Sequence, residues 1–426
     1  MKLVRFGIVG VGTQGGFYAK LLSEDPPPGC ALGALADNDP ERKAVCAERY
    51  PNTPFFEDWH QLVASDQIDA VIVCVPHYLH PVIAMHCLER GMPVLVEKPA
   101  GVYAKQVREM NECAAAHPNV PFAIMFNQRT NRLYQQVRDL VVSGELGEIR
   151  RSNWIINTWW RPDSYYRQSE WRATWGGEGG GVLVNQAPHQ LDLWQWICGV
   201  PTKVYAKIRF GAHREIAVDN DVTMVAEYAN GATGTFVTST HDPMGTDRFE
   251  IDLDGGRIVV DRSEKATVWR LHKNEAALNE TMDMMALARL TMSNAADGSN
   301  GAASLYSEEI IESRDAWGVQ HRTVIENFAQ HLLGMPTGPT SASLRVPSVA
   351  ASSDRQAGSA HLLDGTPLLA PGADGIHGVN LANAALLSAW LGREVENPVH
   401  EELFVSELNK RIADEGRYPL IGAVSQ

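Results

Sequence analysis

The feature that most constrains this chain is a glycine-rich turn close to its start, Gly10-Val11-Gly12-Thr13-Gln14-Gly15. Residues 3–9, rich in Val, Ile and Phe, predict a buried strand before the turn, and residues 17–22 predict a helix after it. In such a unit Gly10 permits a tight turn, Gly12 lets the backbone approach a pyrophosphate, and Gly15 lets the helix pack on the strand. The N-terminus of the helix attracts phosphate groups. The pattern predicts the first unit of a Rossmann domain that binds a dinucleotide.

Strands and helices alternate through the first 126 residues. Each apolar run is followed by a run with helical spacing, and turn residues separate them. This alternation predicts an α/β domain with a doubly wound parallel sheet. The expected strands are 31–36, 69–75, 94–97 and 122–126, and the expected helices are 41–49, 81–90 and 104–116.

The pattern changes near residue 127, where strand-like runs follow one another with few helices between them. Such a run predicts an α+β domain with a large, mostly antiparallel sheet, covered by helices on one face and open on the other. We therefore expect an NAD-binding Rossmann domain over residues 1–126 and a domain for substrate binding and oligomerisation over 127–426. Residues 274–313 show no firm period and are expected to form a long loop or a small excursion. The expected strands are 149–158, 203–210, 221–228, 232–240, 249–253, 257–260 and 266–271, and the helices are 132–142, 322–333, 378–391 and 399–414.

Composition excludes several classes of protein. The net charge of −14 argues against a nucleic-acid surface, which needs clustered Lys and Arg. No run of 18 or more apolar residues is present, which argues against a membrane span, and the N-terminus lacks the pattern of a signal peptide, so we expect a cytoplasmic protein. The six cysteines show no metal-ligand spacing and are expected to be reduced core residues, with no metal site.

Asp37 indicates which dinucleotide binds. It ends the second expected strand, 22 residues after Gly15, where a carboxylate accepts hydrogen bonds from the adenosine ribose hydroxyls. The same charge would repel a 2′-phosphate, so NAD is favoured over NADP, although Arg42 lies near. Ligands bind at the carboxyl ends of parallel strands, and two further loops occupy such ends. The expected cofactor contacts beyond the three glycines and Asp37 are Thr13, Gln14, Val75, Pro76, His80, Glu97 and Lys98.

Taken in order, these motifs resemble the glucose–fructose oxidoreductase/inositol dehydrogenase family, Gfo/Idh/MocA. The resemblance rests on the glycine turn, Val75-Pro76-x-x-x-His80, Glu97-Lys98-Pro99 and the run Gly179-Gly180-Gly181-Val182-Leu183-Val184-Asn185-Gln186-Ala187-Pro188-His189-Gln190-Leu191-Asp192. It spans residues 3 to about 414. It implies a Rossmann domain, an open-faced sheet domain and a homodimer or homotetramer built on that face. It also implies a nicotinamide-dependent oxidoreductase that acts on a sugar or polyol.

The family pattern carries a catalytic lysine onto Lys98 and a catalytic histidine onto His189. It places an aspartate at position 185, where this chain has Asn185, which cannot hold the negative charge that would raise the basicity of His189. We expect His189 to exchange the hydroxyl proton, Lys98 to stabilise the developing oxyanion, and Asn185 to position the substrate or His189. If residues 182–197 form one helix, Asn185, His189 and Asp192 share one face, although Pro188 would bend or restart that helix.

Substrate contacts are expected from the aromatic and arginine-rich segment 159–172. Aromatic faces stack on pyranose rings, while Arg and Tyr donate hydrogen bonds to hydroxyls. The expected substrate-binding residues are Arg129, Tyr166, Trp171 and Arg172, together with Asn185, His189 and Asp192.

Two other functions remain open from the sequence. One is an NAD-dependent glycosidase that oxidises its substrate transiently, which would need an additional acid/base group for proton abstraction at C2. The other is a non-catalytic NAD(H) sensor, which would be expected to lack Lys98 or His189, whereas both are present. The favoured hypothesis is a dehydrogenase that acts on a secondary hydroxyl of a sugar, glycoside or cyclitol.

Overall fold

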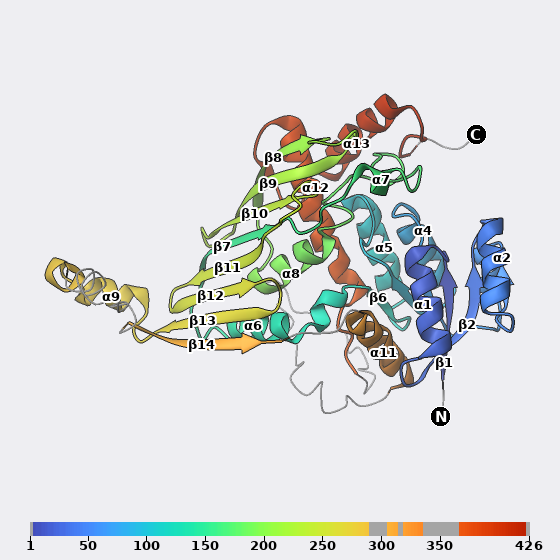
Figure 1. Ribbon diagram of the computed structural model, residues 1–426, viewed down its shortest axis with the longest axis horizontal. Helices are drawn as coiled ribbons and strands as arrows, with labels where there is room; N and C mark the ends of the chain where they lie inside the picture. Colours follow the sequence, from blue (N-terminus) through green and yellow to red (C-terminus); the bar gives the residue numbers. More distant parts are fainter. Residues whose placement is uncertain (1–2, 289–304, 314–317, 335–365, 423–426) are drawn as a thin grey trace.

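The computed structural model describes residues 3–288, 305–313, 318–334 and 366–422, in which two β-sheets carry separate layers of helices (Figure 1). The N-terminal sheet has six parallel strands in the order β3-β2-β1-β4-β5-β6, which confirms the predicted doubly wound fold. The prediction overlooked the short β3 and the helix α3 that follows it. The strands are β1 (Val4–Val9), β2 (Cys30–Ala36), β3 (Phe55–Phe56), β4 (Ala70–Val73), β5 (Val94–Val96) and β6 (Phe122–Ile124).

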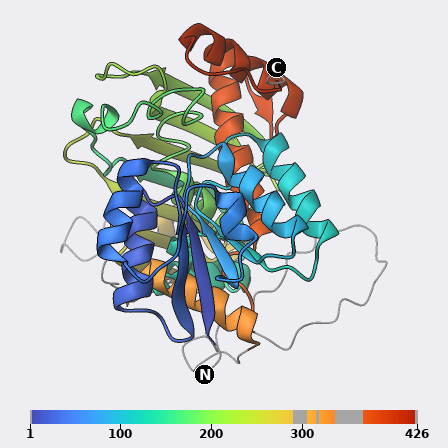
Figure 2. The same ribbon diagram turned by 90° about the vertical axis from the view of Figure 1, so that its right-hand side faces the viewer.

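Helices cover both faces of the parallel sheet. On one face α3 (Trp59–Val63), α4 (Leu79–Glu89) and α5 (Ala104–Ala116) enclose an apolar core with the strands. On the other face α1 (Thr13–Glu24) and α2 (Pro40–Arg49) share a core with α11 (Val319–Leu333), visible in orange beneath the blue strands in Figure 2. Phe328 of α11 packs its ring 6.4 Å from that of Phe6 in β1. The N-terminal sheet therefore takes part of its core from beyond the expected boundary at residue 126.

The second sheet has nine strands in the order β14-β13-β12-β11-β7-β10-β9-β8-β15. All neighbouring pairs are antiparallel except β7 and β10. Its strands are β7 (Ile149–Ile156), β8 (Lys203–Phe210), β9 (Asp219–Glu227), β10 (Thr233–Ser239), β11 (Asp247–Leu253), β12 (Gly256–Asp261), β13 (Lys265–Leu271), β14 (Tyr306–Glu312) and β15 (Val395–Glu396).

The expectation of a loop over residues 274–313 is wrong for its described parts. The helix α9 (Glu275–Thr281) follows β13, and β14 pairs with β13 at the edge of the sheet. β14 is mostly exposed, so its residues lack the apolar alternation by which a half-buried strand is recognised. Residues 289–304 of the expected loop lie outside the described residues.

One face of the second sheet is buried under α6 (Arg132–Val142), α8 (Pro188–Cys198) and α12 (Gly375–Leu391). The other face is open and carries the exposed side chains of Ile155, Tyr205 and Val225 among charged residues. The long α12, red in Figure 1, lies between the two sheets, and α13 (Glu401–Glu415) packs beside it. Within the described residues no helix is long and apolar enough to span a bilayer.

The helix expected over residues 182–197 begins later than predicted. Pro188 occupies the first turn of α8, with Ala187 as its N-cap, and residues 181–187 form turns. Proline lacks an N–H and clashes with the preceding turn, so it is accepted at a helix start rather than inside. Asn185 therefore precedes the helix, and it does not share a helical face with His189 and Asp192.

Candidate active site

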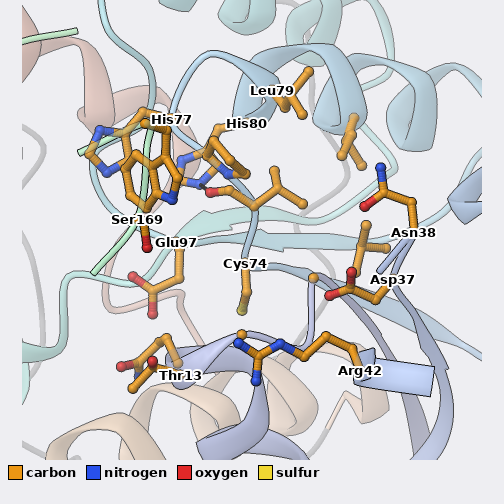
Figure 3. Close-up of a pocket in the computed structure, with 18 of the residues that line it drawn as sticks. Thr13, Asp37, Asn38, Arg42, Cys74, His77, Leu79, His80, Glu97 and Ser169 are labelled. Carbon is orange, nitrogen blue, oxygen red and sulfur yellow. Dashed lines mark hydrogen bonds between the residues drawn. The ribbon is translucent and has the colours of Figure 1, made fainter. Parts of the chain in front are cut away.

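A cavity of about 630 Å³ lies at the carboxyl ends of the parallel strands and extends to the segment 165–172 of the second domain. Figure 3 shows Asp37, Asn38 and Arg42 at one end of it and His77, His80 and Ser169 at the other. Most expected cofactor residues line it, and so do several of the expected catalytic and substrate residues. These lining residues are Gly10, Gly12, Thr13, Gln14, Asp37, Val75, Pro76, His80, Glu97, Lys98, Trp171, Arg172 and Asn185.

The glycine turn has the shape that a bound pyrophosphate requires. Gly10 has φ +88°, and a Cβ there would lie 2.5 Å from the carbonyl oxygen of Cys74. A Cβ on Gly15 would lie 1.9 Å from the carbonyl oxygen of Gly10, so close packing demands glycine at both positions. A Cβ on Gly12 would meet nothing within 4 Å, so this position leaves open space on the cavity side.

Two polar features beside the turn lack partners within the described residues. No side chain caps the N-terminus of α1 at Gly12, which leaves the first N–H groups of the helix available to an anion. Nε2 of Gln14 is buried without a hydrogen-bond partner in the same part of the chain. These donors fit the phosphates of a dinucleotide.

Asp37 lines the same end of the cavity as the glycine turn. Its Oδ2 accepts a hydrogen bond from the backbone N–H of Val11 at 2.7 Å, and its Oδ1 accepts one from the N–H of Asp39 at 3.0 Å. These bonds fix the carboxylate at the end of β2 and leave further lone pairs for ribose hydroxyls. Arg42 lines the same end of the cavity.

The loops after β4 and β5 are held by buried side chains. The ring nitrogens of His80 lie 2.7 Å and 2.8 Å from the carbonyl oxygens of Pro99 and Val75. Burial lowers the pKa of His80 to about 4, so the ring is neutral and donates only one of these two bonds at a time. Glu97 accepts hydrogen bonds from the hydroxyl of Tyr18 and, at 2.9 Å, from the N–H of Lys98. These contacts join the two loops and fix the backbone from which Lys98 projects.

Lys98 connects the two domains at the cavity. Its Nζ donates a hydrogen bond to the carbonyl oxygen of Asn185 at 2.7 Å. Burial lowers the pKa of the ammonium, while the carboxylates of Glu97 and Glu178 act in the opposite direction. The end of β5 and the turn before α8 thus bring together two of the three expected catalytic residues.

His189 lies in the first turn of α8 and does not line the cavity itself. Burial lowers its pKa well below the usual value, and Lys98 and His321 lower it further. Nδ1 of His189 is buried with no hydrogen-bond partner in the described parts of the chain. The ring is therefore a neutral imidazole that senses the charge of Lys98, and its Nδ1 makes no hydrogen bond within those residues.

The far end of the cavity is organised around the hydroxyl of Tyr165. That oxygen accepts hydrogen bonds from Arg172 at 2.9 Å, from Gln186 at 3.2 Å and from Asn185 at 3.4 Å. The guanidinium of Arg172 also lies 4.7 Å from the ring centre of Tyr165 and 4.9 Å from that of Trp171. Sequence reasoning selected Trp171 and Arg172 but missed Tyr165, although Tyr165 belongs to the same aromatic segment.

Glu178 is a buried carboxylate behind this group, and the sequence analysis missed it. Its Oε1 accepts a hydrogen bond from the side-chain amide of Asn185, and its Oε2 accepts one from the N–H of Ala173 at 2.6 Å. Arg172 lies 3.7 Å away. Burial raises the pKa of Glu178 to about 7, although these partners oppose the shift. The available signal was a single acidic residue inside the glycine run 176–181.

Besides His189, three expected substrate residues lie away from the cavity lining. Arg129 is fully buried and donates hydrogen bonds to Asp192 at 2.7 Å and 2.6 Å and to Asp374 at 2.6 Å. The hydroxyl of Tyr166 lies 2.7 Å from that of Thr240. Arg129 and Asp192 therefore join helices in the interior. Tyr166 connects the short helix α7 (Asp163–Tyr166) to the end of β10.

Two family profiles match the chain in sequence order. Residues 4–125 match the profile described as an oxidoreductase family with an NAD-binding Rossmann fold. Residues 134–259 match that of the Gfo/Idh/MocA C-terminal domain. Together the two profiles cover more than half of the chain.

Curated relatives carry the names of dehydrogenases. The chain is 30% identical over 194 residues to inositol 2-dehydrogenase of Rubrobacter xylanophilus, which is 45% of this chain and 52% of the relative. It is 24% identical over 290 residues to levoglucosan dehydrogenase of Pseudarthrobacter phenanthrenivorans, or 61% of this chain and 74% of the relative. The match thus spans about half the length of that inositol 2-dehydrogenase.

Solved structures share the fold over most of the chain. Levoglucosan dehydrogenase in complex with NADH and L-sorbose has a TM-score of 0.67 at 18% identity, covering 93% of this chain and 99% of the other. The WlbA dehydrogenase from Chromobacterium violaceum, in complex with NADH and UDP-GlcNAcA, has a TM-score of 0.67 at 22% identity, covering 93% and 96%. At these identities the likeness supports the two-domain architecture.

Proposed function

The chain belongs to the Gfo/Idh/MocA oxidoreductase family, and on that premise we propose that it is an NAD(H)-dependent dehydrogenase of a carbohydrate or cyclitol. The reaction is hydride transfer between nicotinamide and a secondary hydroxyl or ketone of a sugar, glycoside or cyclitol. The observation that carries the proposal is a single cavity that runs from the glycine turn and Asp37, past Lys98 and Asn185, to Trp171 and Arg172. Such a cavity suits a dinucleotide at one end and a small hydroxylated substrate at the other.

Lys98 and His189 are the residues proposed to act on the reacting oxygen. Nicotinamide, when bound, supplies the hydride acceptor or donor. The Lys98 ammonium stabilises negative charge as it develops on the substrate oxygen. His189 is neutral and its Nδ1 has no partner among the described residues. It lies outside the cavity lining, and it is proposed to reach the substrate to accept the hydroxyl proton in oxidation and return it in reduction. Asn185, anchored by its contacts to Lys98 and Glu178, positions the substrate hydroxyl.

NAD is proposed as the physiological cofactor because Asp37 holds a fixed carboxylate where a 2′-phosphate would lie. Arg42, at the same end, is the residue that would tolerate NADP. Trp171, Tyr165 and Arg172 all line the cavity, and the Arg172 guanidinium lies over both aromatic rings. Aromatic rings and hydrogen-bond donors together are the chemistry that recognises a polyol. The names of the relatives, inositol 2-dehydrogenase and levoglucosan dehydrogenase, are in keeping with such a substrate.

The test is NADH formation, followed by its near-ultraviolet absorbance, with NAD and with NADP. The substrates are myo-inositol, scyllo-inositol, glucose, glucosides, 1,5-anhydroglucitol and levoglucosan. We expect turnover with at least one of them, and a loss of about 100- to 1,000-fold in kcat for Lys98→Ala. Lys105→Ala, which removes a half-exposed lysine paired with Glu402 on the surface, is the matched control. Turnover that survives in both Lys98→Ala and His189→Ala would refute the assigned roles.

Oligomerisation is proposed to use the open face of the nine-stranded sheet. Among its exposed apolar side chains, Tyr205 and Val225 are paired across the adjacent strands β8 and β9, and Ile155 lies on β7, which β10 separates from β9. An apolar group on an otherwise charged face favours a second copy of the same surface. Val225→Glu is expected to shift a homodimer or homotetramer towards monomer in light scattering. A cytoplasmic location is proposed with it, and fractionation of the native host checks this.

A further inference from the structure

The side-chain amide of Asn185 has a defined orientation at the cavity. An amide has a donor end and an acceptor end, whereas an ionised carboxylate only accepts hydrogen bonds. Because Nδ2 of Asn185 donates to Oε1 of Glu178, the acceptor Oδ1 points away from that carboxylate. Oδ1 has no hydrogen-bond partner among the described residues, and Asn185 lines the cavity. The acceptor end of the amide is therefore left for a ligand.

Glu178 is placed to control this orientation because its own carboxylate is buried and hydrogen-bonded. Its exposed fraction is 2%, and the N–H of Ala173 fixes its second oxygen. Its own carbonyl oxygen lies 3.0 Å from Nδ1 of His77. Five charged or titratable groups from four segments of the chain surround it. They are Arg172 at 3.7 Å, Tyr165 through Asn185, Lys98 after β5, His77 after β4 and Asp219 at the start of β9.

We propose that Glu178 is a positioning residue that sets which end of the Asn185 amide faces the substrate. With Glu178 ionised, Asn185 presents its oxygen and accepts a hydrogen bond from a substrate hydroxyl beside Lys98. With Glu178 protonated, its O–H can donate to Oδ1, and the amide turns so that its NH₂ faces the cavity. The negative charge that an aspartate at position 185 would carry is thus held by Glu178, one side chain further from the substrate.

This inference rests on the proposed function and adds a pH dependence to it. Burial raises the pKa of Glu178 to about 7, so the two orientations exchange near neutral pH. Oxidation of a hydroxyl needs the acceptor end, so kcat/KM for oxidation is expected to rise with pH through this range. The Glu178→Gln variant, which cannot ionise, is expected to lose that limb and to lose about tenfold in kcat/KM above it.

Exchanging the acid and the amide between positions 178 and 185 distinguishes a positioning role of Glu178 from a role in packing. Asn185→Asp alone sets two carboxylates in contact and is expected to lower kcat/KM, whereas Glu178→Gln combined with Asn185→Asp returns one carboxylate and one amide. The double variant should recover to within a few-fold of the wild type, better than either single variant. Glu415→Gln is the control for loop damage, since Glu415 binds the N–H groups of Trp175 and Gly176 in the same loop without contacting Asn185. It is expected to keep the pH limb.

A measurement without substrate or cofactor tests the same residue. Infrared difference spectra of the apoprotein between about pH 6 and about pH 8 should contain a carboxylic acid band that disappears in Glu178→Gln. If Glu178→Gln keeps both the band and the wild-type pH limb, the inference is overturned while the proposed function stands. If no substrate in the panel turns over, the infrared band alone decides whether Glu178 titrates, and its absence overturns the inference.

Discussion

Two buried charge clusters are formed by residues that follow the last strand of the parallel sheet, and they differ in how fully their charges are paired. In the first, Arg129 meets Asp192 through two hydrogen bonds and Asp374 through a third. In the second, Glu178 meets an amide and a backbone N–H, and its nearest cation, Arg172, stands 3.7 Å away. Burial disfavours charge in both, but the carboxylates around Arg129 outweigh it and raise the pKa of the guanidinium. Burial prevails at Glu178, whose pKa rises to about 7.

This difference shows how a buried charge with a structural role can be distinguished from one with a functional role. A cluster whose donors and acceptors all bond to one another leaves no polar atom free to bind a ligand. This holds even when its residues belong to a sequence motif. A cluster whose carboxylate is held mainly by neutral donors keeps a titratable charge next to a cavity. The Arg129 cluster joins the 3-10 turn η1 (Asn127–Thr130), α8 and η3 (Gly372–Asp374), whereas the Glu178 cluster borders the candidate active site.

The largest expected effect comes from breaking the paired cluster. Arg129→Met leaves Asp192, 1% exposed, without its cation, and should cost about 3–5 kcal/mol in the free energy of unfolding. Urea denaturation followed by tryptophan fluorescence measures it. Arg248→Met is the control, because Arg248 pairs with Glu250 and Asp261 on the open sheet face and should cost less than about 1 kcal/mol. Equal losses in the two variants would contradict a structural role for the Arg129 cluster.

The second-largest expected effect is a pH-dependent loss of stability that comes from Glu178. The folded protein binds the Glu178 proton more tightly than the unfolded chain does, so this stabilisation is full below about pH 4.5 and is lost as the pH rises to about 7. Relative to Glu178→Gln, which stays neutral, the wild type should lose up to about 3 kcal/mol over that range, at about 1.4 kcal/mol per pKa unit. Denaturation at a series of pH values measures the difference. Parallel curves for the two proteins would show that Glu178 is not held protonated by burial.

The smallest effect tests whether the second cluster extends to Tyr165. Tyr165→Phe removes an acceptor shared by Arg172 and Gln186, so we expect KM to rise by about two- to tenfold with little change in kcat. Steady-state kinetics with the best substrate of the panel measures this change. Tyr166→Phe is the matched control, because its hydroxyl contacts Thr240 away from the cavity lining and its loss should leave KM unchanged. A KM change confined to Tyr166→Phe would reverse the assignment.

The dinucleotide end was predictable from the sequence because its constraints are local. Gly10 and Gly15 are five residues apart, and the clash that excludes a side chain at Gly15 comes from the carbonyl oxygen of Gly10. The strands of the parallel sheet are buried on both faces, so each appears as an apolar run. These signals located the strand ends, and with them the loops that carry His80 and Lys98.

The proposed substrate end and the Arg129 cluster were only partly predictable because their contacts join distant parts of the chain. Lys98 and Asn185 are separated by 87 residues, and Arg129 and Asp374 by 245. A single sequence shows that Arg129 follows a strand, but not that two carboxylates neutralise it. Glu178 has no periodic neighbours and interrupts a glycine run, so only the fold reveals what surrounds it. The edge strand β14 escaped prediction for a related reason, since its burial pattern carries no alternation.

The position of α11 has a consequence for how the protein is made. Val324, Ile325 and Phe328 share a core with Phe6 and Ile8 of β1, although more than 300 residues separate them along the chain. During synthesis all six strands of the first sheet leave the ribosome long before α11 does. Until α11 is made, part of the apolar surface on one face of this sheet is therefore exposed. A fragment cut at residue 126 keeps that surface exposed. We therefore expect such a fragment to aggregate, and nascent chains of intermediate length to be the form of this protein that most needs a chaperone.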